Sequence, residues 1–247
     1  MLTDPLFYLT AIPAVLLYGI AKGGFAGPAA VMAVPIMALF MSPTQAAAIL
    51  LPILVVMDAQ VVRTYWGHFD RRALRILLPG AMVGIALGYL SVGYMNDDHI
   101  RVVIGVLATA FGLQTLFGLR ALSGSEHNPV TGSLFGTLAG FTSFSIHAGG
   151  PPVAMYLLPK GLSPLLFAGT SGMFFAVVNV VKLFPYYALD QLQLGNLTLS
   201  LVLMPLAPLG VAMGHFLVQR TDPTLYYRII SFLLVLVGLR LLTQGLG

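Results

Sequence analysis

The chain has 247 residues, of which 58% are hydrophobic and only 8% are charged, with a formal net charge of +4. A soluble domain carries roughly 25% charged residues, so this composition excludes a water-soluble globule. The absence of cysteine excludes disulfides and cysteine-based zinc sites, and no window has the dense Lys/Arg stripe that binding to nucleic acid requires.

Ten apolar segments follow one another along the chain, separated by glycine, proline and charged residues. They cover residues 6–21, 28–41, 44–62, 73–93, 100–119, 129–145, 151–160, 164–184, 192–218 and 224–242. A helix needs about 20 apolar residues to cross a bilayer. We therefore predict an all-α polytopic protein, with a single transmembrane domain over 1–247, that crosses the inner (cytoplasmic) membrane several times.

The second and seventh segments, of about 14 and 10 residues, are too short to cross about 30 Å of hydrocarbon. Each follows a break rich in glycine and proline, GGFAGP at 23–28 and HAGGPP at 147–152. Such sequences interrupt helices. The pattern predicts broken half-helices that meet near the membrane midplane, with re-entrant loops as the alternative.

The two halves of the chain align with each other as an internal repeat. At an offset of 126 residues, five glycine, alanine and proline positions are identical, and at an offset of 121 Asp58 aligns with Asn179. Repeat one covers 1–120, a linker covers 121–128, and repeat two covers 129–247. Each repeat has five segments, and an odd number predicts that the second repeat is inverted in the membrane.

The basic residues favour this inversion. The loop after the third segment is rich in arginine, whereas the corresponding loop after the eighth segment has none and only Lys182 beside it. By the positive-inside rule, eight basic residues then lie in the cytoplasm and three lie outside, while Lys22 is not assigned. The three outside residues are Arg101, Lys182 and Arg240.

A helix that begins inside the membrane has unpaired N–H groups and a partial positive charge at its N-terminus, and such an end binds anions. Glycine lets a ligand approach the backbone closely. The candidate substrate-binding glycines in the two breaks are Gly23, Gly24, Gly27, Gly149 and Gly150. Alternatively, these glycines only allow close helix packing.

Polar residues precede both breaks. Lys22 is a candidate substrate ligand inside the membrane, or else a side chain that extends to the interface. Ser143 and Ser145 can donate hydrogen bonds to anionic oxygens. His147 is a candidate ligand that could also couple binding to protonation, with a packing role as the alternative.

Asp58 and Asn179 form a polar pair at matched positions of the third and eighth segments. We expect Asn179 to bind substrate and Asp58 to be a coupling group, because an intramembrane carboxylate can carry a proton. The alternative is that Asp58 pairs with Arg63 at the interface, about 7.5 Å away along a helix. Weaker site candidates are Gln45, Gln60, Thr170 and Ser171. The aromatic residues at segment ends, Tyr65, Trp66, Tyr186 and Tyr187, are expected at the membrane interface.

We expect a protein that is not an enzyme and that needs no cofactor or metal. The alternative from another class is an intramembrane serine protease. Residues 169–172, Gly-Thr-Ser-Gly, together with His215 resemble the serine–histidine dyad of rhomboid proteases. Ser171 would be the nucleophile and His215 the base.

The sequence at both breaks resembles the TauE/SafE family of sulfite exporters and sulfonate permeases. The resemblance is carried by KGGFAG at 22–27 and GFTSFSIHAGGPP at 140–152, and it extends over essentially the whole chain. It implies transport of a small sulfur oxyanion or organosulfonate, such as sulfite, sulfoacetate or isethionate. The three oxygens of a sulfonate suit backbone N–H groups, Ser143, Ser145 and a cation.

These observations together predict a secondary active transporter whose partners are a small anionic substrate and the lipid bilayer. The two halves would rock around the bound anion, with proton coupling through Asp58 or His147. The alternative within transport is a passive anion channel that uses the same site. The sequence makes no prediction of transport direction, driving ion or oligomeric state.

Overall fold

The computed structural model describes residues 4–25, 29–37, 40–91, 97–117 and 128–246. Over these residues the chain is helical and has no strand. The first half contains α1 (Pro5–Ile20), a π-helical turn (Ala21–Phe25), a 3-10 turn (Ala29–Met32), α2 (Ala33–Met37), α3 (Pro43–Thr64), α4 (Arg71–Leu90) and α5 (Asp97–Leu116). The second half contains α6 (Pro129–Ile146), α7 (Gly150–Leu157), a 3-10 turn (Leu158–Lys160), α8 (Pro164–Ala188), α9 (Leu194–Leu203), α10 (Leu206–Arg220) and α11 (Pro223–Leu246).

The helices confirm the all-α prediction. Among the described residues, four helices are long and apolar enough to cross a membrane, or up to five if the bent pair α9–α10 is one span. The two central helices begin in the same way. Ser42 caps α3 and Ser163 caps α8 through its side chain, and proline occupies the first helical position in both. A serine cap followed by proline is a favoured helix start, which explains why these boundaries were predictable.

One predicted element is wrong. Residues 192–218 were expected to form one segment, but α9 and α10 are separate helices that meet at 48°. Pro205 and Pro208 both lack an N–H, so two backbone hydrogen bonds are missing within about one helical turn. The corresponding helix of the first half, α4, contains only Pro79 and stays continuous.

The two short predicted segments are short in the structure as well. The α7 helix has eight residues and is therefore about 12 Å long. In the first half, a 3-10 turn precedes the five-residue α2. Gly27 and Pro28 of the first break lie outside the described residues, as does most of the linker, over 121–127.

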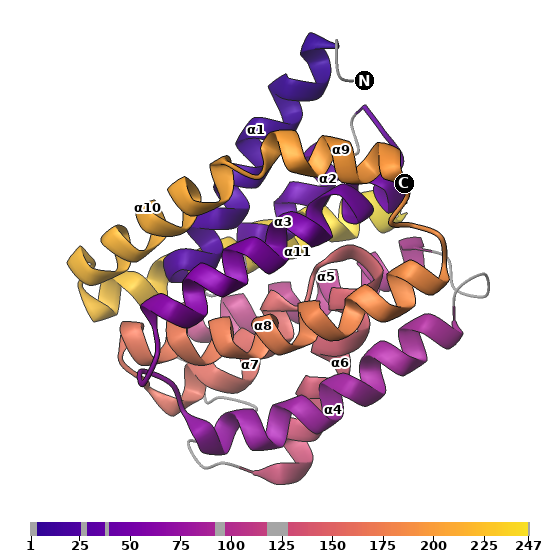
Figure 1. The fold of residues 1–247 in the computed structure, drawn as a ribbon. Coiled ribbons are helices and arrows are strands. Elements are labelled where there is room, and N and C mark those ends of the chain that lie inside the picture. Colours follow the sequence, from indigo (N-terminus) through magenta and orange to yellow (C-terminus); the bar gives the residue numbers. More distant parts are fainter. Residues whose placement is uncertain (1–3, 26–28, 38–39, 92–96, 118–127, 247) are drawn as a thin grey trace.

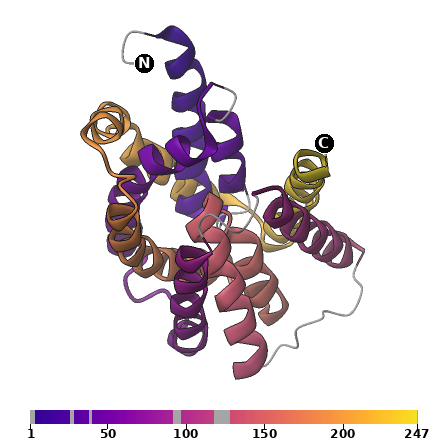
Figure 2. The same ribbon diagram turned by 90° about the vertical axis from the view of Figure 1, so that its right-hand side faces the viewer.

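The most extensive packing joins α4 with α6, α5 with α11, α1 with α10, and α3 with α8. Figure 1 shows α3 and α8 crossing the middle of the molecule, with α4 and α6 on one side and α1 and α10 on the other. Figure 2 shows the α5–α11 pair standing to one side of the remaining helices. Because α3 and α8 lie in the centre, the side chains on the surfaces that face each other are in the interior of the protein.

Glycines let two of these helix pairs approach closely. A Cβ atom on Gly210 of α10 would lie 2.9 Å from the Cα atom of Gly19 in α1. In the other pair, a Cβ atom on Gly84 of α4 would overlap the carbonyl oxygen of Thr137 in α6. Small residues at four-residue spacing commonly form helix interfaces in membranes, and these contacts hold α1 and α6 firmly in place.

Candidate functional site

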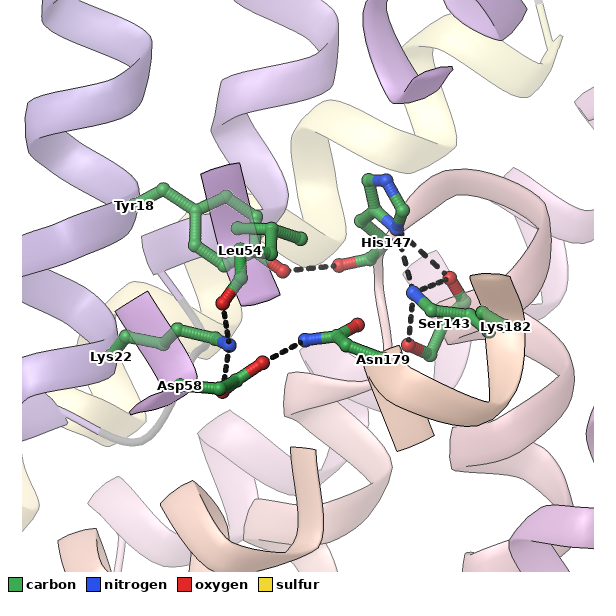
Figure 3. A network of polar contacts seen from close by, with 8 residues as sticks. All are labelled: Tyr18, Lys22, Leu54, Asp58, Ser143, His147, Asn179 and Lys182. Atoms are coloured by element: carbon green, nitrogen blue, oxygen red, sulfur yellow. Dashed lines mark hydrogen bonds and ion pairs between the residues drawn. The ribbon is translucent and has the colours of Figure 1, made fainter. Parts of the chain in front are cut away.

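Polar side chains from four elements meet in the interior of the protein (Figure 3). Each of them is at most 3% exposed. The cluster, hereafter the buried polar cluster, consists of Lys22, Asp58, Ser143, His147, Asn179 and Lys182. Among the described residues, the buried charged side chains are Lys22, Asp58 and Lys182. The cluster is closed to solvent, so a ligand can enter it only when the helices move.

The first part of the cluster is centred on Asp58 in α3. Its Oδ1 atom forms an ion pair with the Nζ of Lys22, and its Oδ2 atom accepts a hydrogen bond from Nδ2 of Asn179 at 2.7 Å. Lys22 also donates to the carbonyl oxygen of Leu54 at 3.3 Å. Asp58 therefore connects the first half of the chain with α8 of the second.

This geometry decides two of the alternatives above. Lys22 is buried in the π-helical turn that follows α1, so an interfacial position for it is wrong. Arg63 is exposed and Asp58 pairs with Lys22, so an interfacial Asp58–Arg63 pair is wrong as well. Short π-helical turns often occur at functional sites, which agrees with the position of Lys22.

The second part of the cluster surrounds Lys182 in α8. Its Nζ lies 2.9 Å from the carbonyl oxygen of Ser143, 3.0 Å from the hydroxyl of Ser143 and 2.8 Å from Nδ1 of His147. The Nε2 of His147 lies 2.9 Å from the carbonyl oxygen of Ala47. The Nδ1 of His147 also lies 3.1 Å from the carbonyl oxygen of Ser143, so each ring nitrogen faces a backbone carbonyl. Two oxygen atoms of Ser143 and the ring of His147 thus surround Nζ of Lys182.

His147 has a backbone conformation that is uncommon outside glycine. Its φ of 54° lies in the left-handed region, and it ends α6. The ring contacts described above hold it in place, and the hydroxyl of Tyr18 donates to its carbonyl oxygen at 3.4 Å. Strained residues of this kind cluster at functional sites when their surroundings fix them. Here the strain directs the chain from α6 into α7.

The start of α7 offers fewer backbone donors than the sequence suggested. Pro151 and Pro152 have no N–H, and the N–H of Val153 donates to the carbonyl oxygen of Gly149 at 3.3 Å. This leaves the amides of Gly149 and Gly150 as donors for a ligand at this turn. Positive charge at the second break therefore comes mainly from Lys182.

Two tyrosines bind backbone carbonyls at the π-helical turn and at the end of α6. The hydroxyl of Tyr65 donates to the carbonyl oxygen of Gly23, and that of Tyr186 donates to the carbonyl oxygen of Phe144 at 2.8 Å. Both were expected as aromatic residues at the membrane interface, and they are only 1% and 2% exposed, so their side chains pack inside the protein. Their hydroxyls satisfy buried carbonyl groups there. Their sequence neighbours Trp66 and Tyr187 are exposed.

Replacing Tyr65 or Tyr186 by phenylalanine is expected to lower the free energy of unfolding by about 1–3 kcal/mol, because each change removes the donor of a buried carbonyl. Thermal unfolding of the purified protein in detergent measures this loss. Tyr187→Phe, at an exposed position, is the matched control and should leave the melting temperature unchanged. Equal melting temperatures for all three variants would contradict the role of these hydroxyls.

The remaining sequence candidates lie around the cluster rather than in it. Ser145 donates to the carbonyl oxygen of Phe141 in its own helix, at 3.0 Å. The Cα hydrogens of Gly23 and Gly24 face α10, where a Cβ atom would overlap backbone carbonyls. Gly149 packs against Ser143, and Gly150 is buried at the start of α7. Gly27 lies outside the described residues.

The weaker polar candidates hold helices together. Gln60 donates to the carbonyl oxygen of Pro208 at 3.2 Å, and Gln45 donates to Oδ1 of Asn196 at 3.3 Å. Thr170 accepts from the N–H of Asp70 at 2.8 Å. These contacts join α3 to α9 and α10, and α8 to the start of α4.

The proposed serine–histidine dyad is not formed in this structure. Within the described residues the hydroxyl of Ser171 is buried without a hydrogen-bond partner. The Nε2 of His215 lies 2.9 Å from Nε2 of Gln219 instead. A nucleophilic serine requires a hydrogen bond to its base, which these two residues do not make. The described residues also contain no group of three or more His, Cys, Asp or Glu side chains that could hold a metal ion.

The sequence interpretation missed Lys182. It was expected outside, close to the end of a segment at 184, but it is 0% exposed and α8 continues four residues beyond 184, to Ala188. The sequence contained a signal for the position of Lys182. It follows Asn179 by three residues, which puts both side chains on one face of a helix.

The family model described as sulfite exporter TauE/SafE matches residues 11–241 of the chain. Neither the curated proteins nor the solved structures include a significant match to the chain.

Proposed function

The chain belongs to the sulfite exporter TauE/SafE family, and we therefore propose that it is a secondary active transporter of a small sulfur oxyanion or organosulfonate. The family is one of membrane transporters for sulfur anions. Sulfite, sulfoacetate and isethionate represent the substrate class. We propose the inner membrane as its location, with several crossings of the bilayer.

The charge of the buried polar cluster is the observation that carries this proposal. Two lysines, Lys22 and Lys182, and one carboxylic acid, Asp58, are buried in the interior of an apolar protein, and only Lys22 forms an ion pair with Asp58 among the described residues. Burying a charge without a counter-ion is costly, and a bound anion offsets that cost. The described interior therefore suits a negatively charged ligand better than a cation or a neutral solute.

The neutral members of the cluster suit the oxygens of such an anion. We propose that the hydroxyl of Ser143 and the amides of Gly149 and Gly150 donate to these oxygens when the site is occupied. Asn179 has an amide that can turn from Asp58 toward the ligand. Lys22, Gly23, Gly24, Gly27 and Ser145 remain proposed contributors in the other states of the transport cycle.

Several contacts support the proposal that the halves are inverted repeats. Exchanging the halves converts the α1–α10 contact into the α6–α4 contact, and both pairs pack extensively. The tyrosine contacts are related in the same way. Tyr65 and Tyr186 are 121 residues apart, as are their acceptors Gly23 and Phe144, which is also the separation between Asp58 and Asn179.

Asp58 supports a coupled mechanism because its contacts span both halves. Rocking of one half against the other changes the distance between Asp58 and Asn179, which lie on α3 and α8. We propose that protonation of Asp58 weakens its hold on Lys22 and Asn179 and so permits the movement. His147, between Lys182 and Ala47, is the second proposed coupling group.

Uptake by proteoliposomes tests the proposed function. The purified protein should accumulate labelled isethionate, sulfoacetate or sulfite above the external concentration when a proton gradient of the correct sign is imposed. Empty liposomes are the control. Uptake of none of these anions in either gradient direction would contradict the proposal.

The same assay distinguishes a carrier from the alternative, a passive anion channel. A channel would equilibrate the anion but would not concentrate it. Uphill accumulation that stops when the proton gradient collapses would exclude the channel. Accumulation that does not respond to the proton gradient would contradict the coupling roles of Asp58 and His147 while leaving transport itself in place.

A further inference from the structure

Among the described buried charges, Lys182 lacks an oppositely charged partner. Its three polar contacts are with a carbonyl oxygen, a hydroxyl and a ring nitrogen, and none of them is with a carboxylate. Lys22, in contrast, forms an ion pair with Asp58. We propose that Lys182 is the counter-charge of the substrate and that the cluster thereby selects a monoanion over a dianion, an inference that rests on the proposed function.

Lys182 is better placed than Lys22 to receive an anion. An anion that approaches Lys22 must compete with Asp58, and it leaves that carboxylate without its cation. An anion that approaches Lys182 replaces only neutral acceptors, and hydrogen bonds between charged partners are stronger than those it displaces. The hydroxyl of Ser143, once released from Lys182, can donate to the same anion.

The surroundings of Lys182 supply further donors. Ser143 packs against Gly149, where a Cβ atom would lie 2.9 Å from the Cβ atom of Ser143. The amides of Gly149 and Gly150 therefore lie beside the hydroxyl of Ser143, at the start of α7. A sulfonate group has three oxygens, which match an ammonium, a hydroxyl and a backbone amide.

The charge of the cluster limits the charge of its ligand. In the bound state that we propose, Lys22 and Lys182 are positive and Asp58 is negative, so these three buried residues carry one excess positive charge. A monoanion brings the sum to zero. A dianion makes it negative by one, and a buried charge without a partner is strongly unfavourable. The site should therefore prefer ligands that carry a single negative charge.

Isethionate and sulfoacetate form a matched pair of ligands for this test. Both have a two-carbon skeleton with a terminal sulfonate. The far end of isethionate is a hydroxyl, whereas that of sulfoacetate is a carboxylate, so the two differ by one charge at similar size. We expect the wild-type protein to bind isethionate at least about tenfold more tightly than sulfoacetate.

Titration calorimetry on the purified full-length protein in detergent measures both affinities. Lys182→Gln and Lys182→Met should each weaken isethionate binding by about 30-fold or more, the loss typical of removing one member of a buried charge pair. Lys160→Gln is the matched control, because Lys160 lies outside the cluster, over the ring of Tyr156. A single gel-filtration peak and a cooperative melting transition show that each variant is folded.

A third variant changes the charge in the opposite direction. Asp58→Asn keeps a side-chain oxygen for Lys22 and raises the excess charge of the cluster by one. It should shift the preference from isethionate toward sulfoacetate relative to the wild type. This comparison and the wild-type affinity ratio test the proposal even if both Lys182 variants fail to fold.

Three results would overturn the inference while leaving the proposed function in place. They are equal wild-type affinities for the two ligands, unchanged isethionate binding by a folded Lys182→Gln protein, and an unshifted preference in a folded Asp58→Asn protein. In contrast, failure of wild-type proteoliposomes to take up isethionate, sulfoacetate or sulfite would overturn the proposed function itself.

Discussion

Replacing Asp58 by alanine is expected to destabilise the protein by about 3–5 kcal/mol. This is the range for removing one partner of a buried ion pair, because the remaining charge stays buried without compensation. The effect falls on both of its partners, since Lys22 loses its carboxylate and Asn179 loses its acceptor. The measurement is thermal unfolding in detergent, accompanied by the yield of monodisperse protein.

Two companion variants make this prediction specific. The double variant Lys22→Met with Asp58→Met removes both charges and should recover most of the stability that Asp58→Ala loses. We expect it to show no transport, because both proposed site residues are absent. Arg63→Ala removes an exposed charge on the same helix and should change the melting temperature little. A stable Asp58→Ala protein, or a double variant no more stable than Asp58→Ala, would contradict the buried ion pair.

The second large effect is expected at Gly84, where α4 packs against α6. A Cβ atom there would overlap the carbonyl oxygen of Thr137 and lie 2.7 Å from the backbone nitrogen of Phe141. The obstacle is backbone, which cannot rotate away, so the two helices must separate. Gly84→Ala should lower the free energy of unfolding by about 3 kcal/mol, the upper part of the usual range for overpacking.

Gly195→Ala provides the control for Gly84. A Cβ atom at Gly195, in α9, meets no other atom within 4 Å. Alanine also has the higher helix propensity, so this change should be neutral or slightly stabilising. If the two alanine variants melt at the same temperature, the close contact between α4 and α6 does not exist in the folded protein.

The helices were largely predictable because the signals that start and stop them are local. Ser42-Pro43 and Ser163-Pro164 are strong starts, and glycine and proline in the breaks are strong interruptions. The division of 192–218 into α9 and α10 was missed because a single proline is tolerated in a membrane helix, as Pro79 in α4 shows. Two prolines three residues apart, Pro205 and Pro208, interrupt the helix.

All members of the buried polar cluster except Lys182 were candidates from the sequence, but their pairing was not predictable. Lys22 and Asp58 were both candidates, yet they are 36 residues apart, and only the packing of the π-helical turn against α3 brings them together. Lys182 was placed outside the membrane, and Tyr65 and Tyr186 were expected at the interface, because each lies near a segment end. Depth inside the protein depends on how far a helix continues and on which neighbours cover it, and neither property is local.

The excess positive charge that we propose for the buried polar cluster would make transport sensitive to membrane voltage. A bound monoanion lowers the net charge of the site by one, so the empty and the loaded carrier would differ by one charge when the site changes sides. Each charge that crosses the full field contributes about 2.3 kcal/mol per 100 mV, so voltage would act differently on the two steps.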